Sequence, residues 1–507
     1  MSGEELRGAL RALEAVVRNR ELLAQLTPEE RKALLVAAGR VVHAEPDQKR
    51  RLVRSLRRAV KERDRQHDRD LRAATGIRMA RQAAVFAAPP RLPGSDPDRG
   101  AGELRQSKSC YVCKRPYTRL HAFYDALCPE CGDLNYEKRF QSAPLDGRVA
   151  LVTGARVKIG YQTALKLLRA GATVVATTRF PHDAARRYAS ESDYGAFRAR
   201  LRIHGLDLRH SPSVEIFCRY LRGELDSLDL LVNNACQTVR RPPGFYEHLL
   251  DFESLSLRDL PDALRPVVSA HHDCVATLED APRLPSGSRD GDGGLVAWSG
   301  GGPGLGLRAS ARLSQVRYDF DESSRRPDLF PLGRVDADLQ QLDLRAHNTW
   351  RQLLAEVPTP EMIEVQLVNA VAPFVLCGKL KPLLSAVASR DAHVVNVSAM
   401  EGVFSRGTKT DRHPHTNMAK AALNMLTLTS SREYVRDGIH MNAVDTGWVT
   451  DEDPWNHAER KRTELDFQPP LDVVDGAARI LDPFFDGLRS GRHVWGRFLK
   501  DYRPSSW

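Results

Sequence analysis

The spacing of apolar residues changes character along the chain. In residues 3–85 they recur at helical intervals, as at Leu6, Leu10, Leu13 and Val17. After about residue 145, short β-branched runs alternate with helical segments. The runs are GRVALVTGA, ATVVATTR, RIHGLDL, LDLLVNNA, HVVNVSA, GIHMNAV and HVWGRFL. This alternation is typical of βαβ units and predicts an α/β fold of the Rossmann type, with a doubly wound parallel sheet between helical layers.

Local signals divide the sequence into three parts. Thr27-Pro28-Glu29-Glu30 predicts a helix start, with a capping hydroxyl and acidic residues in the first turn. A Pro/Gly-rich stretch, APPRLPGSDPDRGAG, then predicts a linker. We therefore expect a basic helical region with a linker over 1–100, a small cysteine module over 104–142, and the α/β domain over 145–507.

The α/β pattern has one long interruption, at about 240–358. It separates the run LVNNA from the helix expected near Pro360, and a direct connection would be far shorter. Its centre, PSGSRDGDGGLVAWSGGGPGLG, is rich in glycine and predicts a mobile loop. Its second half, 318–356, carries aromatic residues and leucines and is expected to be ordered.

Composition and charge narrow the class of protein. The net charge is +10, and residues 1–100 hold 22 Lys/Arg against 14 Asp/Glu. This surplus is explained by solvated helices, or by a nucleic-acid or acidic protein partner. No apolar run approaches the roughly 20 residues that span a membrane, and the N-terminus does not resemble a secretory signal. We therefore expect a cytoplasmic protein without a membrane partner.

Four of the eight cysteines form two C-x-x-C pairs, Cys110/Cys113 and Cys128/Cys131. Each pair directs two thiolates at one centre, and four thiolates satisfy tetrahedral zinc. The spacing predicts a four-cysteine zinc ribbon with a structural ion. Its tyrosines and basic residues suit either nucleic acid or packing against the next domain.

The first strand of the α/β domain runs into a turn and a helix N-terminus. The turn reads Thr153-Gly154-Ala155-Arg156-Val157-Lys158-Ile159-Gly160. Free amides and the helix dipole at such a turn favour a pyrophosphate. The candidate phosphate-binding residues are Thr153, Gly154, Arg156, Lys158, Ile159 and Gly160.

Further motifs follow at the ends of successive strands. They are Arg179, then Gly205-Leu206-Asp207, then Asn233-Asn234-Ala235, and later Asn442-Ala443-Val444-Asp445-Thr446-Gly447. In this order the motifs resemble those of the short-chain dehydrogenase/reductase family. The resemblance implies a nicotinamide cofactor held by the turn together with Arg179, Asp207, Asn233, Asn234, Ala235, Lys420, Thr446 and Gly447.

Two positions in this set bear on the cofactor. Relatives that prefer NAD carry an acid where Arg179 stands, whereas a guanidinium suits the 2′-phosphate of NADP. NADP is therefore expected, with NAD as the alternative. Lys158 replaces the family's middle glycine and offers an ammonium to phosphate.

The family's catalytic set is retained only in part. Asn369 matches its Asn and Lys420 its Lys. The Tyr expected four residues before Lys420 is Thr416, and the catalytic Ser position is Ala399, with Ser398 one residue earlier. The candidate catalytic residues are therefore Asn369, Lys420, Ser398 and Thr416, with His415 as a substitute acid.

Three functions fit these observations. The first is an NAD(P)-dependent oxidoreductase with atypical acid/base residues, acting on an unidentified small carbonyl or alcohol. The second is an inactive NADP-binding protein that serves as an interaction or regulatory module. The third is a nucleic-acid-associated protein that uses the basic helices and the zinc ribbon. The resemblance also implies a homo-oligomer, formed through helices around Asn369 and Lys420.

Overall fold

The computed structural model describes residues 2–43, 45–91, 102–279, 302, 304–318 and 326–507. Most of the predicted linker and most of the glycine-rich centre of the insertion lie outside these residues. The described chain divides into two compact units, Met1–Asp70 and Leu71–Trp507. The contacts thus divide the chain after Asp70, upstream of the Pro/Gly-rich stretch, because segments such as α4 (Gly76–Ala80) pack within the second unit.

The first unit is helical, as the periodicity predicts. It consists of α1 (Gly3–Arg18), a 3₁₀ turn (Arg20–Gln25), α2 (Pro28–Val42) and most of α3 (Pro46–Ala73). Capping boxes start α1 at Ser2 and α2 at Thr27, where the side chain of a glutamate three residues on bonds back to the cap. Neither α1 nor α2 has a buried residue, so both are surface helices.

The cysteine module opens the second unit, after α4. It comprises the antiparallel hairpin β1 (Glu103–Ser109) and β2 (Pro116–Arg119), followed by α5 (Pro129–Arg139). Its core includes Phe123, Tyr124 and Leu127, and it is shared with Val449 and Leu471 of the α/β domain. The module is therefore docked on the α/β domain, and the two share one hydrophobic core.

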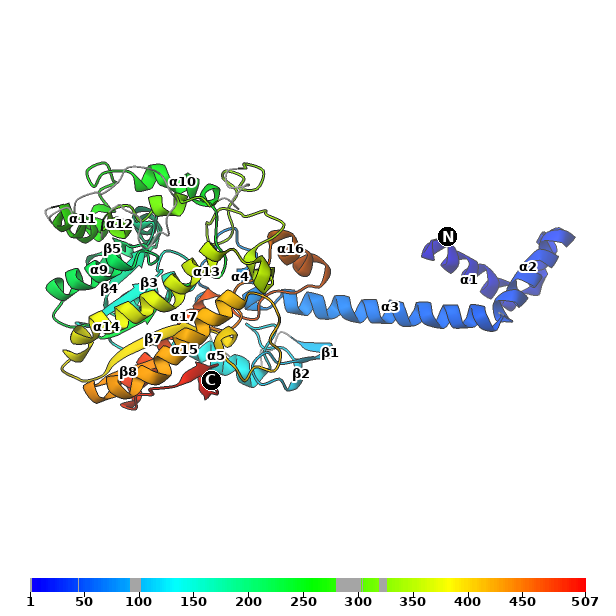
Figure 1. The fold of residues 1–507 in the computed structure, drawn as a ribbon. Coiled ribbons are helices and arrows are strands. Elements are labelled where there is room, and N and C mark those ends of the chain that lie inside the picture. Colours follow the sequence, from blue (N-terminus) through cyan, green and yellow to red (C-terminus); the bar gives the residue numbers. More distant parts are fainter. Residues whose placement is uncertain (1, 44, 92–101, 280–301, 303, 319–325) are drawn as a thin grey trace. The chain divides into compact units, whose positions relative to one another are not determined.

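The predicted α/β sheet is confirmed (Figure 1). Its strand order is β10-β9-β8-β7-β6-β3-β4-β5, and all neighbours are parallel except β9 and β10. The strands are β3 (Val149–Thr153), β4 (Thr173–Thr178), β5 (Leu201–Gly205), β6 (Leu230–Asn233), β7 (Ala392–Ser398), β8 (Ile439–Asp445), β9 (Phe498–Lys500) and β10 (Arg503–Ser505). β9 is shorter than predicted, because Gly496 takes a left-handed backbone conformation (φ +63°) that interrupts an extended strand.

Alternate strand residues face two helical layers. Val395 and Val397 of β7 join one core cluster, and Val394 joins the other. The first face is covered by α6 (Lys158–Arg169) and α17 (Val473–Ser490), and the second by α9 (Ser211–Glu224), α14 (Ala372–Ser385) and α15 (Pro414–Tyr434). The other helices before the insertion are α7 (Pro181–Ala189) and α8 (Tyr194–Phe197), and α16 (Trp455–Glu464) precedes α17.

The continuous helical segment Thr359–Ser385 is long and apolar enough to cross a membrane by those two measures. It comprises α13 (Thr359–Gln366), a π-helical turn (Leu367–Val371) and α14. Leu376, Leu380 and Leu384 of α14 are buried in the core beneath the sheet. This packing is that of a core helix of the α/β domain.

The described parts of the insertion form helices that pack on the α/β domain. They are α10 (Pro243–Glu253), α11 (Arg265–Glu279) and α12 (Leu305–Arg308), with short 3₁₀ turns at Arg312–Gln315, Thr349–Arg351 and Leu354–Glu356. Leu307 of α12 and Cys274 of α11 are buried in the same core cluster as α9. The insertion is thus partly built into the domain. Within its second half, Phe330 is buried against Phe245 and Leu249 of α10.

Candidate functional site

A cleft of about 610 Å³ lies at the carboxyl ends of the parallel strands. This is the position where open α/β sheets bind ligands. Its lining begins at the turn between β3 and α6, passes Arg179 and ends near Ser398 and Lys420. The insertion contributes a wall that consists of Arg240, Arg241, Phe245, Tyr246, Asp336, Gln340, Gln341, Leu342, Asp343, Arg345, His347 and Asn348.

The predicted phosphate turn is tightly fixed. Thr153 Oγ1 accepts hydrogen bonds from the amides of Asn234 and Ala235, both at 3.0 Å. Asn234 Nδ2 in turn donates to the Thr153 carbonyl at 2.9 Å. A Cβ on Gly160 would lie 2.3 Å from the carbonyl oxygen of Gly154, so only glycine fits there. The turn therefore has the close backbone packing that a phosphate cradle requires.

Lys158 adopts a left-handed backbone conformation in this turn (φ +54°). A side chain in that region costs about 1 kcal/mol or more, because its Cβ approaches the following carbonyl. The charge of Lys158 acts on Glu452, a half-buried residue that lines the cleft, and on Asp338 of the insertion. The family's glycine position thus holds a strained lysine that faces acidic groups.

Replacing Lys158 by glycine is expected to raise the free energy of unfolding by about 1 kcal/mol, because glycine adopts positive φ without strain. Urea unfolding of the purified chain measures the change. Lys158→Ala is the matched control, since it removes the ammonium but keeps the Cβ. Equal stabilities of the glycine and alanine variants would show that backbone strain at this position is negligible.

Arg179, at the end of β4, is held by aromatic side chains. Its Nη2 donates to the hydroxyl of Tyr246 at 2.7 Å, and its guanidinium lies 4.7 Å from the centre of that ring. No acidic group among the described residues forms an ion pair with it. By contrast, Arg156 is committed to Asp183, with Nη1 and Oδ2 2.6 Å apart. Of these two arginines, Arg179 is the one available to an anionic ligand.

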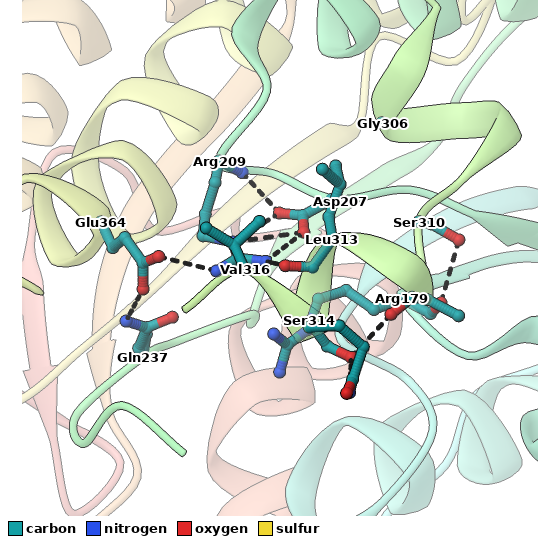
Figure 2. A network of polar contacts seen from close by, with 12 residues as sticks. Arg179, Asp207, Arg209, Gln237, Gly306, Ser310, Leu313, Ser314, Val316 and Glu364 are labelled. Atoms are coloured by element: carbon teal, nitrogen blue, oxygen red, sulfur yellow. Dashed lines mark hydrogen bonds and ion pairs between the residues drawn. The ribbon is translucent and has the colours of Figure 1, made fainter. Parts of the chain in front are cut away.

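The carboxylate of Asp207 is bound within the protein (Figure 2). Arg209 donates to it from Nη2 at 2.7 Å, and also donates to Glu364 from Nη1 at 2.7 Å. All three side chains are buried. Burial alone would raise the pKa of Asp207, but the charge of Arg209 lowers it below its usual value. Asp207 lines the cleft as an ion-paired carboxylate.

Asn233 and Asn234 differ in placement. Asn233 is buried in the sheet, where its Nδ2 donates to Asn396 Oδ1 of the adjacent strand at 2.8 Å. It does not line the cleft, whereas Ala235 and Asn234 do. Asn233 therefore joins β6 to β7, and its role toward a cofactor stays a prediction.

Lys420 and Ser398 lie at the inner end of the cleft. Lys420 Nζ donates to the Val397 carbonyl at 2.7 Å. Ser398 Oγ donates to Asn424 Oδ1 of α15 at 2.6 Å, on the face opposite that of Val397, as strand alternation predicts. The ammonium and the serine are thus fixed beside each other by β7 and α15.

Asn369 lies in the π-helical turn between α13 and α14. Its Oδ1 accepts from the Gln237 amide at 2.8 Å, and its Nδ2 donates to the Gln237 carbonyl at 3.0 Å. π-helical turns occur frequently at functional sites, because the extra residue redirects side chains. Here the turn aims Asn369 at the loop after β6, and Gln237 of that loop lines the cleft.

Thr416 and His415 are buried and do not line the cleft. Within the described residues, Thr416 Oγ1 and both ring nitrogens of His415 have no hydrogen-bond partner. Burial lowers the pKa of His415 to about 4, so its ring is neutral near pH 7. The nearby His413 stacks on Trp350 with ring centroids 4.0 Å apart. Neither candidate for the family's tyrosine position therefore reaches the cleft.

The loop after β8 connects the cleft to the cysteine module. Thr446 lines the cleft, and Gly447 takes a positive φ (+76°) beside it. The amide of Trp448 donates to the hydroxyl of Tyr111 at 2.9 Å, and Tyr111 lies within the first cysteine pair. The module therefore holds the segment that borders the cleft.

The four cysteine sulfurs form one cluster, with all ligand atoms within 4.8 Å of one another. Cys113 Sγ and Cys128 Sγ are 3.7 Å apart. Sulfurs at about 2.3 Å from a tetrahedral zinc ion would be about 3.8 Å apart. The donor set and its spacing fit zinc.

Comparison with known proteins gives two matches that bear on the family of this chain. The family model for short chain dehydrogenase matches residues 148–255. An uncharacterized protein of Acanthamoeba polyphaga mimivirus is 33% identical over 405 residues, covering 78% of this chain and 74% of the relative. The chain belongs to the short-chain dehydrogenase/reductase family.

Two further similarities are to carbonyl reductases. Carbonyl reductase [NADPH] 1 of Sus scrofa is 43% identical over 89 residues, which is 17% of this chain and 30% of that protein. The NADPH-bound carbonyl reductase from chicken fatty liver has a TM-score of 0.40 at 17% identity, covering 72% of this chain and all of that one.

Several cleft residues lie outside the motifs of the short-chain dehydrogenases. Tyr246 and Arg240 come from the insertion, Arg209 follows the third strand motif, and Glu452 precedes α16. The sequence contains a local signal for the ion pair of Asp207 and Arg209, because an arginine two residues after a strand-end aspartate can fold back on its carboxylate. The sequence contains no such signal for the insertion residues, since only the tertiary fold brings them to the cleft.

Proposed function

We propose that this chain is an NADP(H)-dependent oxidoreductase of the short-chain dehydrogenase type that acts on a small carbonyl or alcohol. The observation that carries the proposal is one continuous cleft, which runs from the glycine-dependent phosphate turn past Arg179 to Lys420 and Ser398. Bound NADP(H) would supply the hydride or accept it. The turn would hold its pyrophosphate, and Lys420 and Ser398 would hold groups at the reacting end.

Proton transfer needs a group other than the family's tyrosine. Among the described residues, Tyr246 is the one tyrosine that lines the cleft, and it is bonded to Arg179. Burial alone would raise the pKa of Glu452, but the charges of Lys158 and Arg241 lower it, so this residue is an ionised carboxylate. These observations favour a second candidate function, which is NADP(H) binding without turnover in an interaction or regulatory module.

Two measurements separate the candidates. The first is NADPH binding by fluorescence titration, and the second is NADPH oxidation with a panel of aldehydes and ketones. Turnover that Lys420→Ala lowers by about 100-fold or more, while Lys381→Ala preserves it, supports the oxidoreductase. Lys381 is a suitable control because it pairs with Glu433 and Asp437 outside the cleft. Tight NADPH binding with no oxidation by any member of the panel supports the second candidate.

Arg179→Ala is expected to weaken NADPH binding by about 10- to 100-fold and to leave NADH binding nearly unchanged. A charge-assisted hydrogen bond contributes about 1.5–3 kcal/mol, and only NADPH carries the 2′-phosphate that would accept it. Calorimetric titration with each nucleotide measures the ratio. Arg198→Ala, at an exposed position after α8, is the control. Equal losses for the two nucleotides would rule out a 2′-phosphate role for Arg179.

We also propose that Cys110, Cys113, Cys128 and Cys131 bind a structural zinc ion. The support is the cluster of four sulfurs at zinc-like spacing, in a module whose hairpin and helix are short. A closed set of four thiolates leaves no coordination position for a substrate. The ion would therefore hold the module, and through Tyr111 it would hold the loop after β8.

A further inference from the structure

Three histidines gather at the amino ends of β7 and β8, the end of the sheet opposite the cleft. His393 and His440 are each the second residue of their strand, and the register places them directly beside each other. His393, Val395 and Val397 are alternate residues of β7, so their side chains lie on the same face of the sheet. His393 therefore projects toward α17. His493 reaches the same place from the connection between α17 and β9. Three separate segments therefore converge on one point.

The three rings are close enough to share one ion. One ligand nitrogen from each lies within 4.8 Å of the other two. His393 Nε2 and His493 Nδ1 are 2.9 Å apart, and the rings of His440 and His493 stack with centroids 4.6 Å apart. A Cβ on Gly487 of α17 would lie 2.5 Å from His493 Nδ1 and 3.3 Å from His393 Nε2. Glycine at this position leaves the space around the facing nitrogens open.

The protonation of the rings suits a metal ion. Burial lowers the pKa of His393 well below its usual value, and burial also lowers the pKa of His440 and of His493. His440 Nδ1 lies 3.3 Å from the Ala392 carbonyl, so this nitrogen carries the proton and Nε2 presents its lone pair. A histidine ligand commonly donates its second nitrogen to a backbone carbonyl in this way.

The pairing of His393 with His493 is incomplete as a hydrogen-bonded structure. The two facing nitrogens share one proton, whereas His393 Nδ1, the other ring nitrogen, is buried without a partner among the described residues and would carry the proton if Nε2 bound an ion. A divalent ion would accept the lone pairs of both facing nitrogens at once. The carboxylate of Asp391 acts electrostatically on all three rings, and its partner Arg148 acts in the opposite sense on His393 and His493.

We propose that His393, His440 and His493 bind a divalent transition metal ion of the zinc class. Neutral imidazoles suit Zn²⁺, Co²⁺, Ni²⁺ and Cu²⁺, and three of them leave one tetrahedral position for water. The ion would connect β7 and β8 to the segment after α17. Because the site lies at the amino ends of the strands, it is distinct from the cleft and from the cysteine cluster.

Cobalt titration of the full-length, metal-free protein is the first test. We expect two Co²⁺ ions per chain, one with strong thiolate charge-transfer bands and one with only the weak visible bands of nitrogen ligation. Binding of one ion with thiolate bands alone would overturn the proposal. The spectra also separate the two sites, because failure of the cysteine cluster would remove the thiolate bands and leave the weak ones.

Variants then assign the second ion. His440→Gln and His493→Gln are expected to weaken zinc at this site by at least about 10-fold, with the thiolate bands unchanged. His272→Gln is the matched control, because His272 stacks on His182 with their Nε2 atoms 3.4 Å apart but no third ligand atom completes a cluster within the described chain. Two ions in every variant would overturn the assignment, and so would equal loss in the control. The cobalt spectra of the unmodified chain decide the question if a histidine variant does not fold.

Discussion

Arg209→Met is expected to lower the free energy of unfolding by about 3–5 kcal/mol. Arg209 is buried and bonded to two buried carboxylates, Asp207 and Glu364. Methionine fills similar space but leaves both carboxylates without their cation in a region of low dielectric constant. Breaking a buried pair by removing one partner costs this amount because the remaining charge is uncompensated. Urea unfolding at pH 7, followed by circular dichroism, measures the loss.

A charge-matched series tests the cause of that loss. Arg312→Met removes an exposed arginine of the insertion and is expected to change stability by less than about 0.5 kcal/mol. Adding Asp207→Asn to Arg209→Met is expected to recover part of the stability, because a buried amide costs less than a buried carboxylate. No recovery in the double variant would show that packing, and not charge, accounts for the effect.

The full set of partners of Arg209 could not be predicted from the sequence. The turn at Thr153–Gly160 could be predicted because strand, turn and helix are adjacent in the chain, and the structure has the same elements there. Asp207 was assigned to the cofactor on a strand-end motif alone. Its carboxylate is instead paired with Arg209, which is further fixed by Glu364 from α13 and by the Leu313 carbonyl. No local pattern could indicate partners so distant in sequence.

At the reacting end of the cleft and in the histidine cluster, too, local patterns predict some side-chain positions and tertiary packing decides the others. Ser398 lies on the α15 side of β7, which the period of a strand predicts. That His415 and Thr416 point away from the cleft depends on how α15 packs, which their sequence spacing does not reveal. His393 and His440 become neighbours only through the register of β7 and β8. Parallel strands pair across long connections, so the sequence alone does not fix that register.

The cysteine module holds two segments of the α/β domain, the start of α17 and the loop after β8 that borders the cleft. The Tyr124 hydroxyl donates to Asp475 at 2.6 Å, and Arg139 forms ion pairs with Asp472 and Asp475 at the start of α17. The Tyr111 hydroxyl meanwhile accepts from the Trp448 amide in the loop after β8. Loss of the module would expose these buried charges and release that loop. Direct contacts therefore connect the proposed metal site to the loop that borders the cleft.

Cys128→Ser is expected to unfold the cysteine module and to weaken NADPH binding. Structural zinc contributes about 10–16 kcal/mol at pH 7, which is comparable to the whole stability of a domain, so a module this short is not expected to fold without it. Thermal unfolding should show a large fall in Tm, and proteolysis should cut within 104–142.

Cys236→Ser, which changes an exposed cysteine outside the cluster, is the stability control. Tyr111→Phe removes only the bond to Trp448, so it should weaken NADPH binding modestly and keep the zinc. A Cys128→Ser chain with the unmodified Tm and no cleavage in the module would show that the thiolates hold no structural ion.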